Sequence, residues 1–97
     1  LNATDERGCT PLFAACTCQY SRVEVVRSLL KAGADPALAE ENEVTPLHLA
    51  AQNGHLDVVD MLHAAAPATL NLYTANGDTP LFMACYNERE NVVSRLL

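Results

Sequence analysis

Cysteine and histidine are the residue types of this chain that could hold a metal ion or serve in nucleophilic catalysis. They occur at Cys9, Cys16, Cys18, Cys85, His48, His55 and His63. Cys16 and Cys18 are close in sequence, but two residues apart on a helix their side chains would point about 200° apart. A metal site there would need distortion and further ligands, so we expect no metal.

Other signatures of catalysis are missing from the sequence. It contains no glycine-rich phosphate loop, no nucleophile elbow and no pair of carboxylates in a defined acid-base frame. We therefore expect no catalytic residue and no cofactor, and we expect that the chain is not an enzyme.

The size and charge of the chain narrow the possible partners. Its 97 residues fit one domain, and 49% apolar residues suffice for a folded core. A net charge of -6 repels nucleic acid and anionic lipid. No apolar run approaches the ~20 residues that span a bilayer, so we expect no membrane insertion. The four cysteines are expected to be reduced thiols, in an intracellular and most simply cytoplasmic protein.

The tripeptide Thr-Pro-Leu occurs three times and defines an internal repeat. Its copies begin at Thr10, Thr45 and Thr79, so they lie 35 (45 minus 10) and 34 (79 minus 45) residues apart. Each copy is followed by a pair of small residues and later by a Val-Val pair. A fixed period of this length indicates an array of stacked units.

Each repeat predicts two short helices. Threonine is a good N-cap and proline suits the first helical position, so a helix begins at each Thr-Pro. In the middle copy this helix ends near Asn53 and Gly54, which is a suitable left-handed stop. A second helix follows, with an apolar stripe at Leu56, Val59 and Leu62. Because pairs this short cannot bury both faces alone, they must stack on one another.

Residues 45–59, with the sequence TPLHLAAQNGHLDVV, resemble the ankyrin-repeat signature almost residue for residue, and residues 31–35 resemble the end of such a unit. The resemblance implies an all-α fold, an ankyrin-repeat α-solenoid of stacked helix-turn-helix units with projecting β-hairpin loops. It implies one domain over 1–97, with units at about 5–39, 40–73 and 74–97, the last incomplete. We expect a monomeric fragment of a longer array.

The chain also departs from that family, whose period is about 33 residues. Two extra residues lie near 18–22 and one lies around 63–67. The second hairpin tip, over residues 40–43, lacks the glycine usual before the threonine, so its turn is expected to be strained or differently shaped. Cys16 and Cys85 occupy the place of a small packed alanine of the inner helix, so we expect both to be buried.

The histidines are interpreted as structural. The resemblance implies that His48 makes hydrogen bonds between neighbouring loops, and His55 also matches the family pattern. His63 lies near the end of an outer helix, where positive charge suits the helix dipole. Phe13 and Phe82 replace the signature histidine, and we expect them to pack between units, with partial exposure as the alternative.

Ankyrin repeats usually grip partners with their hairpin tips and with the exposed side of the inner helices. Carried over by position, the partner-binding residues are Glu6, Arg7, Cys9, Thr17, Cys18, Glu41, Asn42, Val44, Gln52, Asn53, Tyr73, Ala75, Asn76, Asp78, Tyr86 and Asn87. Tyr86 is the first choice for a hot spot and Tyr73 the second, because aromatic side chains contribute large contact areas at low entropic cost.

The resulting prediction is a non-catalytic module that binds a protein or peptide with basic patches. The acidic group at Glu40, Glu41 and Glu43 is either a solvated loop or part of that surface. Two alternatives stay open. The chain could be a regulatory or targeting segment of a larger enzyme or channel, or a substrate for asparagine hydroxylation at Asn2 or Asn71.

Overall fold

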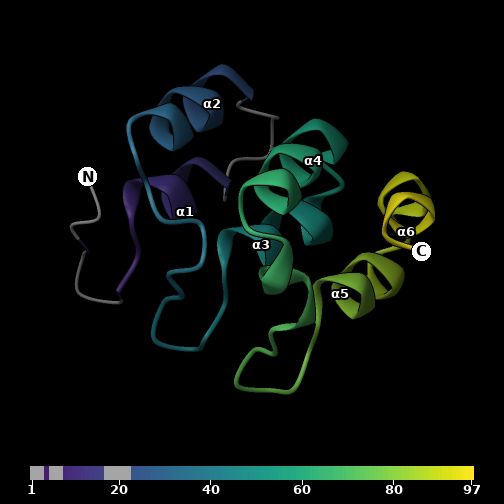
Figure 1. The fold of residues 1–97 in the computed structure, drawn as a ribbon. Coiled ribbons are helices and arrows are strands. Elements are labelled where there is room, and N and C mark those ends of the chain that lie inside the picture. The colour runs from purple at the N-terminus through teal and green to yellow at the C-terminus, as the bar shows by residue number, and fades with distance from the viewer. Residues whose placement is uncertain (1–3, 5–7, 17–22) are drawn as a thin grey trace.

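The computed structural model describes residue 4, residues 8–16 and residues 23–97, and this part of the chain is helical. The elements are α1 (Pro11–Cys16), α2 (Val23–Lys31), α3 (Pro46–Asn53), α4 (Leu56–Ala65), the 3-10 helix η1 (Pro67–Asn71), α5 (Pro80–Tyr86) and α6 (Glu90–Leu96). Figure 1 shows how they succeed one another as three helical pairs. The predicted all-α solenoid is confirmed.

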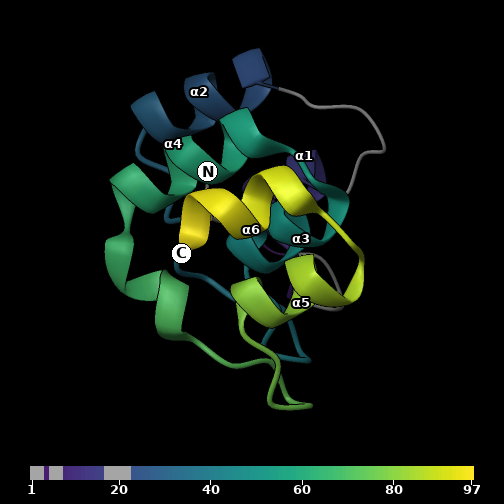
Figure 2. The ribbon, with the colours of Figure 1, turned by 90° about the vertical axis from the view of Figure 1, so that its right-hand side faces the viewer.

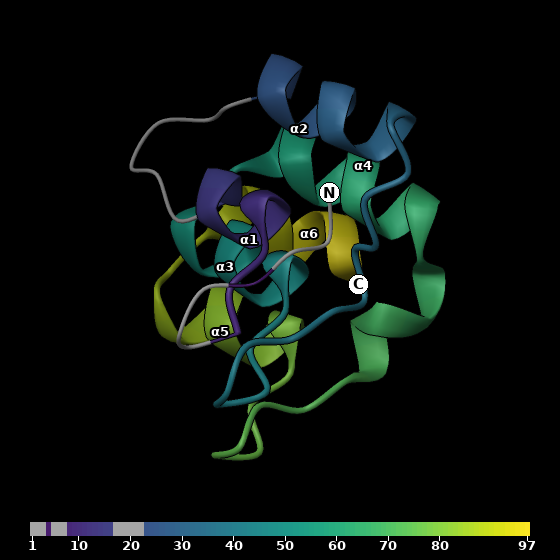
Figure 3. The same cartoon turned by 90° about the vertical axis from the view of Figure 1, so that its left-hand side faces the viewer.

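The helices form two layers. The inner helices α1, α3 and α5 lie side by side, as do the outer helices α2, α4 and α6, so that α3 contacts both α1 and α5. Figure 2 looks onto the α5–α6 end of the stack and Figure 3 onto the α1–α2 end. The loops that precede α3 and α5 project together from one side of the molecule.

The Thr-Pro pairs start the inner helices as predicted. The hydroxyl oxygens of Thr10, Thr45 and Thr79 each accept a hydrogen bond from the backbone N–H three residues later. In α3 the helix ends at Gly54, which has a φ of 73° in the left-handed region and donates its N–H to the last turn. The capping residues therefore fix both ends of a helix that has only 8 residues.

Small residues on the inner helices let the repeats approach closely. Ala50, Ala51 and Ala84 are fully buried, and they share one core with Val59 and Val92 of the outer helices. A buried alanine fills little space, so the neighbouring backbone can lie against it at the density typical of protein interiors. The core is therefore continuous from one repeat to the next and belongs to no single pair.

The projecting loops are tight turns, and the described residues form no β-strand. In the second loop Glu40 donates its N–H to the Val44 carbonyl, and in the third loop Thr74 donates its N–H to the Asp78 carbonyl. In the acidic group, for which a solvated loop was one of two alternatives, Glu41 and Glu43 are exposed but Glu40 is only 9% exposed. Its Oε1 accepts the N–H groups of Asn42 and Val44, at 2.7 and 3.2 Å.

Thr74 occupies the equivalent place in the third loop. Its Oγ1 accepts the N–H groups of Asn76 and Asp78, at 3.3 and 3.2 Å. Glu40 and Thr74 share no chemistry except a side-chain oxygen within reach of the turn. One such oxygen suffices, because it satisfies the two backbone donors that the turn directs inward.

Glu43 takes the place of the missing tip glycine. Its φ is 61°, close to the 82° of Gly8 and the 84° of Gly77 at the matching positions. The second turn therefore keeps the shape of its neighbours. The cost is backbone strain, because a side chain in the left-handed region places Cβ close to the following carbonyl.

The exposure of Cys85 and the 3-10 helix η1 were not predicted from the sequence. Cys85 was expected to be buried like Cys16, but it is exposed. The extra residue around 63–67 is accommodated where α4 ends and η1 begins at Pro67, after Ala66 adopts a φ of −148°.

The strain at Glu43 predicts that Glu43→Gly stabilises the chain. Glycine removes the steric cost of Cβ in the left-handed region, but it also increases the conformational entropy of the unfolded chain. The first effect should be larger, so the free energy of unfolding should rise by about 0.5–1 kcal/mol. Urea denaturation followed by circular dichroism measures this. Glu41→Gly, at an exposed position without positive φ, is the matched control and should give no gain. An equal gain in both variants would contradict the strain at Glu43.

Candidate partner-binding surface

His48 connects the second repeat to the loop of the third. Its Nδ1 accepts the N–H of Thr45 at 3.1 Å, so the proton lies on Nε2. Nε2 then donates to the carbonyls of Leu72 and Asp78, at 2.9 and 3.0 Å. Those two carbonyls flank the third turn on either side. The predicted structural role of His48 therefore agrees with the geometry: one imidazole fixes both arms of the next loop.

Burial lowers the pKa of His48 from its ordinary value of 6.5. The backbone carbonyls of Leu72 and Asp78, and the Asp78 charge, favour the protonated form but do not outweigh the loss of hydration. A proton on Nδ1 would also remove the acceptor that the Thr45 N–H uses. The neutral ring is therefore the form that holds the two repeats together.

Further hydrogen bonds set the repeats against one another. The Ala75 N–H donates to the Asn42 carbonyl at 2.8 Å and joins the second and third loops. The Asn53 side chain donates to the Cys16 carbonyl, and Arg89 Nε donates to the Gln52 carbonyl. Each of these contacts crosses from one repeat to the next. The positions of the exposed side chains are therefore fixed by the stack and not by their own loops alone.

A shallow pocket opens on the inner-helix side, between α3 and α5. Its volume is about 290 Å³, and it is lined by Gln52, Asp78, Phe82, Met83, Tyr86 and Asn87. Four of these six were predicted from sequence as partner-binding residues. A site of this size is at or below the lower limit of the about 300–1,000 Å³ typical of small-molecule sites. It suits one or two side chains of a partner.

The rings of Phe82 and Tyr86 form one wall of this pocket. They stack with centroids 6.2 Å apart and planes inclined by 29°, one turn apart on α5. Phe82 is 52% exposed and Tyr86 is 79% exposed. Phe13, at the position of Phe82 in the first repeat, is buried at 5%. Of the two outcomes left open for these phenylalanines, packing holds for Phe13 and exposure for Phe82.

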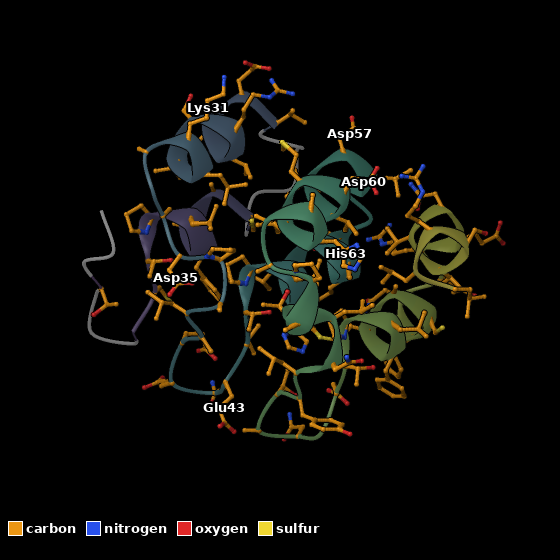
Figure 4. All side chains as sticks on the ribbon, viewed as in Figure 1. Lys31, Asp35, Glu43, Asp57, Asp60 and His63 are labelled. Atoms are coloured by element: carbon orange, nitrogen blue, oxygen red, sulfur yellow. The ribbon has the colours of Figure 1, made fainter. Side chains whose placement is uncertain are left out.

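The remaining predicted residues differ in their exposure. Glu41, Asn42, Ala75 and Asn76 are exposed on the projecting loops, while Cys9, Val44 and Asn53 are partly buried. Tyr73 is 65% exposed before the third loop but does not line the pocket. In Figure 4, Glu43 lies at the end of the second loop and points away from the helices.

Some predicted residues cannot be placed. Glu6, Arg7, Thr17 and Cys18 lie outside the described residues, as does Asn2. Asn71, the other candidate for hydroxylation, is exposed at the end of η1. The roles of all these residues stay predictions.

Met83 was not predicted from the sequence as a pocket residue, and Phe82 was not among the predicted partner-binding residues, although its partial exposure was left open. Both lie early in α5, in the segment Pro80–Tyr86. A phenylalanine at a position where the signature has a polar histidine was one available signal, because it adds an apolar ring four residues before Tyr86. That spacing brings two side chains onto one face of a helix.

No metal site is evident in the described part of the chain, where no three His, Cys, Asp or Glu side chains converge. A second depression, beside Cys85, is lined by Glu88, Glu90, Val93 and Ser94. Neither depression contains a histidine. Among the helices described above, none is long and apolar enough to span a membrane.

Together, the stacked helical pairs and the side chains gathered on their inner face define a repeat protein with a recognition surface. Residues 18–97 match the family described as ankyrin repeats in three copies. The chain belongs to the ankyrin-repeat family. Ankyrin repeats generally mediate protein–protein interactions, and such domains are typically non-catalytic.

Several known proteins contain a segment similar to this chain. Human "Transient receptor potential cation channel subfamily A member 1" is 33% identical over 97 residues, which cover 100% of this chain and 8% of that protein. Human "Neurogenic locus notch homolog protein 4" is 33% identical over 93% of the chain, and mouse "Ankyrin repeat and SOCS box protein 11" is 39% identical over 77%. The matched segments make up 4% and 22% of those two proteins. The chain thus spans less than a quarter of each.

The link through His48 predicts that His48→Gln destabilises the chain. The loop carbonyls lose a buried donor, which should lower the free energy of unfolding by about 1–3 kcal/mol at neutral pH. Urea denaturation with circular dichroism detection measures the loss.

The lowered pKa of His48 also predicts a pH dependence. Below pH 6.5 the imidazole of His48 takes up a proton in the unfolded chain but stays neutral in the folded chain, because its folded pKa is lower. The contribution of His48 to the free energy of unfolding is therefore fully present above pH 6.5. It falls as the pH drops from 6.5 toward the pKa of the folded state. The unfolding midpoint of the wild type should fall more steeply between neutral and mildly acidic pH than that of His48→Gln. Parallel pH curves for the two proteins would rule out this role.

Proposed function

We propose that this chain is a non-catalytic module that binds a protein or peptide through its hairpin tips and the exposed face of its inner helices. The observation that carries the proposal is the pair Phe82 and Tyr86, stacked and exposed at the wall of a pocket between two repeats. Exposed aromatic rings that contact each other lose little side-chain entropy on binding, because they are already partly ordered. Such pairs make effective anchors.

The arrangement of the tips supports the same surface. The second and third loops are joined by the hydrogen bond from Ala75 to Asn42, and His48 holds the third loop against α3. A partner would therefore meet a preformed surface and would not have to order it. Preorganisation lowers the cost of association and favours specific binding.

The parent protein is proposed to be larger than this chain. The relatives that it resembles include a channel and a Notch protein, each with the similar segment making up a small part of its length. In such a setting the module would recruit or position a partner for activities located elsewhere. This agrees with the alternative of a regulatory or targeting segment.

The proposal predicts that Tyr86→Ala weakens binding about tenfold or more, because it removes an anchor of the size typical of hot spots. Proteins recovered from a cell lysate on the immobilised wild-type chain would be purified and titrated against both forms by calorimetry. Tyr86→Phe keeps the ring and should bind nearly as well. Val25→Ala, at an exposed position of the outer helix α2, is the control. Unchanged affinity of Tyr86→Ala for every recovered partner would contradict the proposed surface.

The net charge of -6 predicts that association is faster at low salt. The Debye length falls from about 10 Å at 0.1 M salt to about 3 Å at 1 M, so attraction to a basic partner is screened. Stopped-flow measurement with a recovered partner should show an association rate constant that drops about tenfold or more over this range. A constant rate would exclude steering by the acidic residues.

A further inference from the structure

We propose that the pocket between α3 and α5 is an arginine site: it receives one arginine side chain of the bound protein or peptide, stacked on the aromatic wall and paired with Asp78. The inference rests on the proposed function and deepens it by naming the chemistry of the recognised group.

The aromatic wall suits a planar cation. The rings of Phe82 and Tyr86 stack on each other, yet both remain more than half exposed, so part of each ring surface is free. A guanidinium lying on such a surface gains cation–π and stacking contact. Its aliphatic stem can cover apolar atoms such as those of Met83, which also lines the pocket.

Asp78 provides the negative charge at the same pocket. The ion pairs of the described residues join Arg27 to Glu24 and Arg95 to Asp60, so Asp78 takes part in neither. Its backbone is fixed on both sides, since its N–H donates to Thr74 and its carbonyl accepts from His48. The main chain that carries the carboxylate is therefore held in place beside the pocket.

The amides complete a set of acceptors. Asn87 donates its Nδ2 to the Met83 carbonyl at 2.8 Å, which leaves its Oδ1 as an acceptor. Gln52 also lines the pocket. A guanidinium carries five N–H donors in one plane, whereas a lysine ammonium is a compact point charge. A flat aromatic wall with several acceptors therefore favours arginine over lysine.

Arg89 is the cation nearest to this arrangement along the chain, and it does not fill the site. Its Nε donates to the Gln52 backbone carbonyl at 2.9 Å, and its side chain lies against Gly54. It is not among the residues that line the pocket. Among the described residues, Asp78 therefore lines the pocket without an arginine or lysine beside it in the lining.

The test begins with a library of random linear peptides displayed on phage and selected on the 97-residue chain. Enriched peptides are expected to share an arginine. One of them is then synthesised with arginine, lysine or glutamine at that position and titrated by calorimetry against wild type, Asp78→Asn and Tyr86→Ala. Asp57→Asn is the matched control, because Asp57 is exposed on α4 at the side opposite the loops in Figure 4.

We expect that the effect of Asp78→Asn on affinity depends on whether the peptide carries arginine. Asp78→Asn should weaken the arginine peptide about tenfold, as for the loss of a charged hydrogen bond, but should leave the glutamine peptide unchanged. The lysine peptide should bind less tightly than the arginine peptide, and Asp57→Asn should bind like wild type. Circular dichroism and the unfolding midpoint establish that each variant is folded.

The remaining outcomes separate the two proposals. If no peptide is enriched, binding through this surface fails and the arginine site with it. If peptides are enriched without a shared arginine, or if Asp78→Asn affects arginine and glutamine peptides equally, the arginine site is wrong while peptide binding stands. Binding of the arginine peptide that is insensitive to Tyr86→Ala places the cation elsewhere and also overturns the site.

Discussion

The close contact between inner helices of successive repeats is the constraint on which this structure depends. Helices of 6 to 8 residues have too little apolar surface to stand alone. Alanines at Ala50, Ala51 and Ala84 allow the neighbouring backbones to approach, and the valines of the outer helices close the core above them. The pocket between α3 and α5 lies at such a junction between repeats.

Much of the fold could be predicted from the sequence because its signals are local. A threonine cap, a proline at the first helical turn and a left-handed glycine act within a few residues, and α3 contains all three. The shape of the second turn could not be predicted in this way. It depends on Glu40 bending back to the turn and on Glu43 tolerating a positive φ, and neither behaviour is typical of glutamate.

The candidate site was predicted in part, for a similar reason. Positions carried over from the family located Gln52, Asp78, Tyr86 and Asn87, because the repeat period fixes where each side chain lies on its unit. For Phe82 the sequence left packing and exposure open, since the exposure of this position depends on which repeat contains it. The equivalent Phe13 is covered in the same stack. The position of a side chain within a unit is encoded locally, whereas its burial depends on the neighbours that the unit contacts. Cys16 and Cys85 differ in the same way, since the first is buried and the second is exposed.

The shape of each turn depends on hydrogen bonds that do not involve the side chains at its tip. A buried side-chain oxygen of Glu40 or Thr74 accepts hydrogen bonds from the backbone N–H groups that point into each turn. The hydrogen bond that joins the two turns connects two backbone groups, the Ala75 N–H and the Asn42 carbonyl. The side chains of Glu41, Asn42, Ala75 and Asn76 project outward from this frame. New specificities can therefore arise at these positions by substitution without disturbing the architecture. Because different residues determine the fold and the recognised partner, binding specificity can evolve while the fold is kept.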